Sequence, residues 1–113
     1  MTTVFSKIIS GEIPNTPVYE DDLVYAFDDI SPVAPVHVLV IPKQPIVNLN
    51  DVDVSHEAML GRLLHAARKV AEAKGIAHNG YRCVINNGGD AGQSVFHLHL
   101  HVIGGRSMSW PPG

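Results

Sequence analysis

The sequence has little of what secreted and membrane-spanning proteins need. It contains a single cysteine, Cys83, so no disulfide can form within the chain. Because Cys83 lies in the apolar run of residues 81–85, we expect it to be a buried small hydrophobic residue. No stretch approaches the roughly 20 consecutive apolar residues of a membrane-spanning helix, and residues 1–11 lack the apolar core of a signal peptide. We therefore expect a cytoplasmic protein without a membrane partner.

The sequence also lacks an excess of positive charge. Its 8 lysines and arginines stand against 11 aspartates and glutamates, which gives a formal net charge of −3. A protein that binds nucleic acid polymers needs basic residues to neutralise phosphates, so no such partner is expected. The 113 residues, of which 45% are hydrophobic and 17% charged, fit one globular domain over residues 1–113.

The spacing of apolar residues and turn residues predicts seven elements in the order α-β-β-β-α-β-β. A short helix is expected to begin at Thr2 or Thr3 and to end at Gly11, and a long helix is expected over residues 55–74. The apolar stripe of the long helix consists of Met59, Leu60, Leu63, Leu64, Ala67, Val70 and Ala71. Strands are expected over residues 18–20, 23–28, 36–41, 81–86 and 96–103. This order predicts an α+β domain around a mainly antiparallel sheet.

Histidine is abundant, with seven in the chain, and three of them alternate along the last expected strand as His97, His99 and His101. Side chains of a strand alternate between its faces, so these imidazoles are expected on one face and the intervening apolar residues on the other. Burying three imidazoles as packing would leave ring nitrogens without partners, at about 1 to 3 kcal/mol each. The pattern therefore indicates a chemical site.

Two kinds of site fit these histidines. Histidines two apart can bind zinc, but His97 and His101 lie about 13 Å apart along a strand, so a pair plus a distant ligand would be needed, and His37 is the one obvious helper. Alternatively, the neutral imidazole of His99 attacks an electrophile, while its two neighbours set its tautomer and stabilise developing charge. The second kind of site requires a place nearby that binds an anion.

A glycine-rich connection over residues 86–94 directly precedes the histidines. Its glycines let the backbone present N–H groups, and Gln93 and Ser94 add side-chain donors, which suits a phosphate. A flexible hairpin connection has a similar composition, so the position of the loop carries this interpretation. The carboxylate of Asp90 would repel a phosphate, and we expect it to point outward.

The run HLHLHVI at residues 97–103 fits the pattern His-φ-His-φ-His-φ-φ, with φ hydrophobic, of the histidine-triad superfamily. The chain resembles the Hint branch of that superfamily, the histidine-triad nucleotide-binding proteins, over nearly its whole length. Further motifs that match in the same order are FSKII at 5–9, EIP at 12–14, AFDDISP at 26–32, AP at 34–35, His37, VIPK at 40–43, GQSV at 92–95 and GGR at 104–106. The sister branch that cleaves dinucleoside polyphosphates is less similar in the amino-terminal half and the tail.

This resemblance implies a fold and an activity. The implied fold is a five-stranded, mainly antiparallel sheet with a short N-terminal helix and one long helix, and two sheets join into ten strands in a homodimer. The implied activity is hydrolysis of purine nucleoside phosphoramidates and of aminoacyl- or lysyl-adenylates to the nucleoside monophosphate. It proceeds through a nucleotidyl-histidine intermediate, without a metal or another cofactor. The tail is expected to approach the partner's active site, where Trp110 would contact the leaving group.

The resemblance also implies roles for individual residues. His99 corresponds to the nucleophile, and His101 contacts the phosphate and the leaving group. The supporting network contains His37 and His97, and Ser94 hydrogen-bonds to the phosphate or leaving group. The other implied nucleotide-binding residues are Asp29 at the ribose, Asn86, Gly92 and Gln93 around the phosphate, and Phe5, Ile8, Phe27 and Ile30 along the purine. Core packing explains the last four equally well, and apolar walls predict weak discrimination between adenine and guanine.

Two other functions remain open from the sequence. The chain could be a nucleotide-binding module that acts mainly through protein contacts, or a dinucleoside polyphosphate hydrolase. The complete set of catalytic residues favours an enzyme, and release of free monophosphate from a phosphoramidate distinguishes an enzyme from a binding module.

Overall fold

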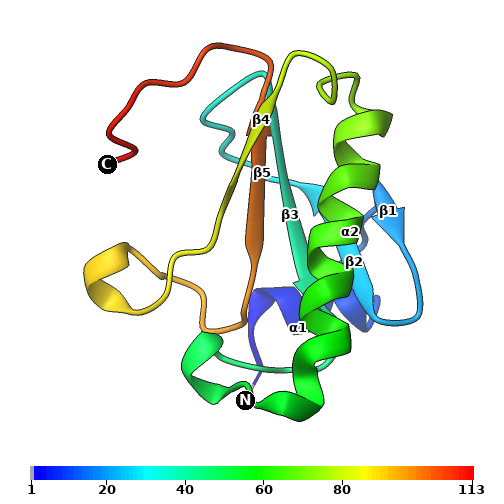
Figure 1. Ribbon diagram of the computed structural model, residues 1–113. Helices are drawn as coiled ribbons and strands as arrows, with labels where there is room; N and C mark the ends of the chain where they lie inside the picture. Colours follow the sequence, from blue (N-terminus) through cyan, green and yellow to red (C-terminus); the bar gives the residue numbers. More distant parts are fainter. Residues whose placement is uncertain (1) are drawn as a thin grey trace.

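The computed structural model describes residues 2–113 and has the expected order of elements (Figure 1). Three short 3-10 helices, η1 (Leu49–Asp51), η2 (Val54–His56) and η3 (Gly89–Ala91), lie in the connections. The two helices are α1 (Val4–Ile9) and α2 (Glu57–Ala73), and the strands are β1 (Tyr19–Glu20), β2 (Val24–Asp28), β3 (Val36–Pro42), β4 (Tyr81–Val84) and β5 (Leu100–Gly104). The strands form one sheet in the order β1-β2-β3-β5-β4, and every neighbouring pair is antiparallel. The predicted α+β class and five-stranded antiparallel sheet are confirmed.

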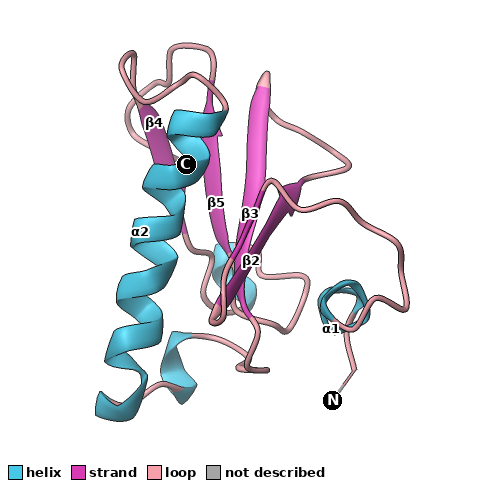
Figure 2. Cartoon of the chain, turned by 90° about the vertical axis from the view of Figure 1, so that its right-hand side faces the viewer, coloured by secondary structure: helices cyan, strands magenta, loops and turns pink. Residues whose placement is uncertain are grey.

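The sheet separates two apolar clusters. Figure 2 shows α2 on one side of the sheet and α1 on the other. The cluster under α2 includes Val38, Val40 and Leu100, which alternate with residues that face the opposite side. On that opposite side, Phe5 of α1 packs with Tyr25, Phe27, Leu39 and Ile41. The strands are therefore apolar on both faces, and α1 covers its face only in part because it is short.

The stripe of α2 follows the expected helical spacing with one exception. Met59, Leu63, Ala67, Val70 and Ala71 are buried against the sheet. Leu60 is partly buried, and Ala66 joins the buried face. The prediction that Leu64 belongs to the core is wrong, since its side chain is 61% exposed. Because one turn of helix is 3.6 residues, a stripe through positions 59, 63, 67 and 70 leaves position 64 at its margin.

The turn before β2 is held by Asp21, as the expected tight turn requires. Its Oδ1 accepts hydrogen bonds from the N–H groups of Leu23 and Val24, and its Oδ2 accepts one from the hydroxyl of Tyr19. Arg62 of α2 pairs with the same carboxylate at 3.2 Å. Partial burial opposes ionisation, but these hydrogen bonds outweigh it and hold the pKa of Asp21 at about 2.

The last strand is shorter than predicted, because β5 begins at Leu100 and not at residue 96. The register between β3 and β5 pairs Val40 with Leu100. Two residues further along this register, Leu98 would lie opposite Pro42. Proline has no N–H to donate, and the ladder stops there. The N–H of Leu98 instead donates to the carbonyl of Ile46 at 2.7 Å.

Strand β4 forms an edge of the sheet, since it pairs only with β5. The prediction that Cys83 is buried is wrong, because alternate residues of this edge strand are exposed and Cys83 is one of them.

Among residues 2–113, no helix is long and apolar enough to cross a membrane.

Candidate active site

A cavity of about 450 Å³ opens on the α1 side of the sheet. It is lined by Val4, Phe5, Ile8, Ile13, Pro14, Asn15, Phe27, Asp28, Asp29, Ile30, Leu39, Ser94, Val95, His99 and His101. Eight of the predicted site residues are in this set: Phe5, Ile8, Phe27, Asp29, Ile30, Ser94, His99 and His101. The other five, His37, Asn86, Gly92, Gln93 and His97, do not line it. The cavity therefore collects apolar walls, two carboxylates, an amide, a hydroxyl and two imidazoles.

The histidines and the leucines between them face opposite sides of the sheet, as predicted. Leu98 and Leu100 belong to the cluster under α2, while His97 and His99 contact the edge of Phe5 on the other side. The alternation persists although only His101 lies within β5. The extended backbone before the strand preserves the two-residue period that places the imidazoles together.

His99 has a tautomer that the backbone fixes. Its Nδ1 lies 2.7 Å from the carbonyl oxygen of His97, and a carbonyl can only accept, so Nδ1 carries the proton. The Nε2 atom of the neutral ring then holds a free lone pair. The side chain is only 7% exposed and lines the cavity, with its ring centroid 5.1 Å from that of Phe5. The backbone therefore keeps the proton on Nδ1 and leaves Nε2 as the nitrogen that can act as a nucleophile.

His97 is the most deeply buried of the three histidines. Its Nε2 donates to the carbonyl oxygen of Pro42 at 2.8 Å. Pro42 is the last residue of β3. Burial lowers the pKa of His97, so the ring is neutral near pH 7. His97 does not reach the cavity, and it acts on the site through its own carbonyl, which fixes His99.

A chain of hydrogen bonds fixes the tautomer of His101 as well. The backbone N–H of Val33 donates to Nδ1 of His37 at 3.1 Å, so the proton of that ring lies on Nε2. Nε2 of His37 lies 2.8 Å from Nδ1 of His101, which must therefore accept. His101 then carries its proton on Nε2, and this buried N–H has no partner within the described chain. An unpaired buried donor in the wall of the cavity is a place for a ligand oxygen.

The environment of His101 disfavours its charged form. Burial is the main cause, and repulsion by His99 and His37 adds to it, so that the pKa of His101 falls to about 4 despite the nearby carboxylate of Asp29. The ring is neutral near pH 7. It can donate a hydrogen bond from Nε2, whereas its Nδ1 already accepts a hydrogen bond from His37.

Asp29 lines the cavity and lies beside His37. Its Oδ1 accepts from the N–H of Ser31 at 2.8 Å, and its Oδ2 lies 3.4 Å from Nε2 of His37. One ligand atom each of Asp29, His37 and His101 falls within 4.8 Å of the others, which is close enough to consider a metal. The two nitrogens, however, are 2.8 Å apart, whereas nitrogens bound to tetrahedral zinc are about 3.3 Å apart. This spacing is that of a hydrogen bond, so the set fits a proton-bearing pair better than a zinc site.

The glycine-rich loop is organised by Gln93. The side-chain N–H groups of Gln93 donate to the carbonyls of Val47 and Val95, and its oxygen accepts from the N–H of Gly88. The expectation that this amide offers a free donor to a phosphate is wrong, because the loop itself uses it. Gly92 adopts a left-handed conformation with φ of 86°, which permits the turn into Gln93. Ser94 is exposed beside the cavity, and Asp90 is exposed as expected.

Sequence reasoning missed the backbone groups that set the two tautomers. These are the N–H of Val33 and the carbonyl of His97, and no side-chain pattern signals either. It also missed Pro14 and Asn15, which line the cavity from the irregular segment between α1 and β1. Their residue types are those of a loop, and only the fold places them there.

Comparison with known proteins matches the HIT domain over residues 10–108. Three relatives are similar over almost the whole chain. The "Purine nucleoside phosphoramidase" of Escherichia coli K12 is 53% identical over 94% of this chain and 89% of its own. The "Adenylylsulfatase HINT1" of Arabidopsis thaliana is 53% identical over 98% of this chain and 76% of its own. The "14 kDa zinc-binding protein" of Brassica juncea is 53% identical over 98% of this chain and 99% of its own.

Solved structures agree with this match. The crystal structure of a HIT family hydrolase from Legionella pneumophila Philadelphia 1 has a TM-score of 0.95 and 48% sequence identity to this chain. The similarity covers 99% of this chain and 100% of that one. At this similarity the path of the backbone through the site is shared as well as the order of the elements.

Proposed function

The chain belongs to the HIT domain family of hydrolases, and on that premise we propose that it cleaves purine nucleoside phosphoramidates and aminoacyl- or lysyl-adenylates to the nucleoside monophosphate. The observation that carries this proposal is the tautomer of His99. Its Nδ1 is occupied by the carbonyl of His97, so a lone pair on Nε2 remains in a cavity large enough for a nucleotide.

In the first chemical step, Nε2 of His99 attacks phosphorus, a P–N bond to the imidazole forms, and the bond to the leaving amine breaks. The amine leaves with a proton taken from water at the open mouth of the cavity. In the second step, water attacks phosphorus, the bond to Nε2 breaks, and a proton returns to solvent. With a phosphoramidate, the two steps together consume one water and release an amine and a nucleoside monophosphate. With an acyl-adenylate, the P–O bond to the acyl group breaks in the first step, and the carboxylate leaves without taking up a proton.

His101 contributes as a neutral donor. Its unpaired Nε2–H lies in the wall of the cavity that also holds His99, with the ring centroids 5.0 Å apart. A preorganised donor beside the nucleophile stabilises charge that develops on a phosphoryl oxygen. Ser94, exposed beside the same cavity, would hydrogen-bond to the leaving group, and the backbone near Gly92 and the side chain of Asn86 would lie around the phosphate.

The apolar wall of the cavity fits a purine base, and the carboxylate of Asp29 fits the ribose. Phe5 and Phe27 are buried and meet edge to face at 5.5 Å, which gives a firm wall. Ile30 is 98% exposed at the rim, where a bound base would cover it. Asp29 lines the cavity, and a carboxylate suits the vicinal hydroxyls of ribose. None of these groups reads the exocyclic atoms of the base, so adenine and guanine would be processed alike.

A homodimer forms part of the proposal. The open edge of β4 presents unpaired backbone groups, and Leu64 and Tyr81 are exposed apolar residues, of α2 and β4. Pairing of β4 with its copy would join two five-stranded sheets into ten strands and bring Trp110 of the tail near the partner's site. Analytical ultracentrifugation tests it: the wild-type chain should sediment as a dimer, and Leu64→Glu should shift it toward a monomer. Cytoplasmic location stays a prediction from the sequence.

The test of the activity is a substrate panel. Adenosine phosphoramidate, guanosine phosphoramidate, lysyl-adenylate and diadenosine polyphosphate are each incubated with the protein, and free monophosphate is measured. We expect rapid release from the first three and slow release from the fourth. Fast cleavage of the polyphosphate alone would instead assign the chain to dinucleoside polyphosphate hydrolysis. Tight nucleotide binding with no monophosphate released from any compound would indicate a binding module.

A further inference from the structure

The chain just after β5 touches the loop that connects β2 to β3 through two consecutive residues. The guanidinium of Arg106 donates to the carbonyl oxygen of Val33 from Nε at 3.3 Å and from Nη2 at 3.1 Å. The preceding Gly105 has φ of +90°, and a Cβ at that position would lie 2.9 Å from Cβ of Pro35. The turn at residues 105–106 and the loop at residues 31–35 are therefore fitted closely to each other.

Val33 links this turn to the active site, because its two backbone groups point to different partners. Its carbonyl accepts from Arg106, and its N–H donates to Nδ1 of His37. His37 in turn donates from Nε2 to His101, whose free Nε2–H lies in the cavity wall. Hydrogen bonds on both sides of Val33, joined through its backbone, thus connect an exposed arginine to the unpaired donor of His101.

The direction of this series matters for the chemistry. If the N–H of Val33 did not point at His37, either nitrogen of that ring could carry the proton. With the proton on Nδ1, Nε2 of His37 would accept a hydrogen bond from Nδ1 of His101. His101 would then present a lone pair to a phosphoryl oxygen in place of its N–H. The other titratable groups that face His37 are Asp29 and His101, and neither occupies Nδ1.

We propose that Arg106 is a positioning residue of the hydrolytic reaction: by holding the carbonyl of Val33 it restrains the backbone of that residue, whose N–H keeps the proton of His37 on Nε2 and so leaves the Nε2–H of His101 free for the substrate. This inference rests on the proposed function for its kinetic consequence, but not for its tautomeric one. The guanidinium of Arg106 donates to the carbonyls of Val33 and Ser107, and neither of these residues lines the active-site cavity. It is exposed, so it contributes position and not core packing.

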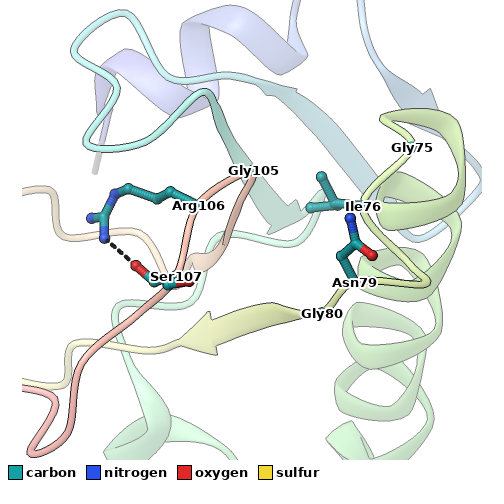
Figure 3. A pocket seen from close by; sticks show the side chains of 7 residues that line it. All are labelled: Gly75, Ile76, Asn79, Gly80, Gly105, Arg106 and Ser107. Atoms are coloured by element: carbon teal, nitrogen blue, oxygen red, sulfur yellow. Dashed lines mark hydrogen bonds between the residues drawn. The ribbon is translucent and has the colours of Figure 1, made fainter.

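A second hollow, of about 460 Å³, lies beside Arg106 and is lined by Gly75, Ile76, Asn79, Gly80, Gly105, Arg106 and Ser107. Figure 3 shows the guanidinium turned away from Ile76 and Asn79 and bonded to Ser107. Because Arg106 is exposed, removal of its side chain leaves the carbonyl of Val33 accessible to a free guanidinium ion from solution. Chemical rescue is therefore a practical test.

The experiment compares Arg106→Ala with Arg82→Ala. Arg82 is a matched control, since its guanidinium also donates to a carbonyl of the tail, that of Ser109, but makes no bond to Val33. In Arg106→Ala we expect kcat for adenosine phosphoramidate to fall about fivefold with KM changed less than about twofold, because a donor to the transition state is lost and substrate binding is not. Arg82→Ala should keep the wild-type tautomers of His37 and His101, because its guanidinium makes no bond to Val33. Guanidinium chloride at millimolar concentration should restore part of kcat in Arg106→Ala, and equal urea should not.

A second measurement is independent of any substrate. In the wild-type protein, nitrogen-15 NMR should report protonated Nε2 atoms for both His37 and His101, and Arg106→Ala should show mixed tautomers at both rings. Wild-type kcat and unchanged tautomers in a folded Arg106→Ala variant would overturn the proposal. So would a loss of activity that guanidinium and urea affect equally. If the wild-type protein hydrolyses no phosphoramidate, the proposed function fails, and the tautomers still decide whether Arg106 positions His37 and His101.

Discussion

Nδ1 of His99 lies 2.7 Å from the backbone carbonyl of His97, two residues earlier in the same extended segment. A side chain and a carbonyl so close in sequence keep this geometry wherever the segment stays extended. The contact therefore fixes the nucleophilic nitrogen without a carboxylate partner. His97 is itself held by Pro42, so the end of β3 determines how the nucleophile is presented.

Replacement of His99 removes the nucleophile and leaves the walls of the cavity. We expect His99→Asn to lower kcat for adenosine phosphoramidate by at least about a thousandfold, because no lone pair remains to form the intermediate. Adenosine monophosphate should still bind within about threefold of the wild-type Kd, since the apolar walls and Asp29 persist. Steady-state kinetics and calorimetry measure the two effects. The control is His65→Asn, an exposed histidine of α2, which should change neither. Undiminished turnover by His99→Asn would refute the assignment.

His101 acts as a hydrogen-bond donor and so can be partly replaced. His101→Ala should lower kcat by about a hundredfold, as loss of one preorganised donor does. His101→Gln keeps an amide N–H and should recover part of that loss. Kinetics of both variants with the same substrate test the prediction. Equal defects in the two variants would show that more than a donor is lost.

The buried histidines make stability depend on pH. In the folded protein the pKa of His101 is lowered to about 4, and the pKa of His97 is also lowered. Histidines of the unfolded chain have a pKa of about 6.5, so below pH 6.5 the unfolded chain binds more protons than the folded protein. The free energy of unfolding should therefore be highest above pH 6.5 and fall as the pH drops toward 4. Urea titrations between pH 7 and 4.5 measure this, and His101→Gln should show a shallower decline. The contribution of Asp21 is lost only below about pH 3.8, because its pKa is lowered to about 2, so the two windows do not overlap. An identical decline in wild type and variant would contradict the prediction.

Asp29 should act mainly on the ribose. With a ribonucleoside phosphoramidate, Asp29→Asn should lower kcat/KM by about tenfold, because charged hydrogen bonds to the hydroxyls are lost. With the corresponding 2′,3′-dideoxyribonucleoside compound, the same variant should differ from wild type by less than about threefold. A loss of equal size on both compounds would place the main role of Asp29 at His37, which lies 3.4 Å away.

Metal removal tests the alternative site. The protein treated with a chelator and desalted should keep its activity, since every proposed step uses protein groups and water. Loss of activity that zinc restores, and that other divalent cations do not, would instead favour a metal role for Asp29, His37 and His101. The relative named as a zinc-binding protein makes this measurement informative.

Much of the fold could be predicted from local patterns. Thr3 caps α1 through a capping box with Ser6, Asp21 forms the turn before β2, and both signals depend on residues close in sequence. The errors have a different origin. The sequence mispredicts Cys83 because the short apolar run of residues 81–85 does not reveal whether its strand is central or at an edge of the sheet. The start of β5 was misjudged because its limit is set by Pro42, a residue of another strand.

The sequence by itself determined the alternation of imidazoles and leucines, because a period of two follows from the extended backbone alone. It also determined the class of fold, and motifs spread along the chain indicated His99 as the candidate nucleophile. Only the tertiary structure decided which nitrogen of each ring carries the proton. Those protons are fixed by the carbonyls of Pro42 and His97 and by the N–H of Val33. Every residue has such backbone groups, so residue identity does not mark the ones that act, and only the folded path of the chain brings them to the imidazoles.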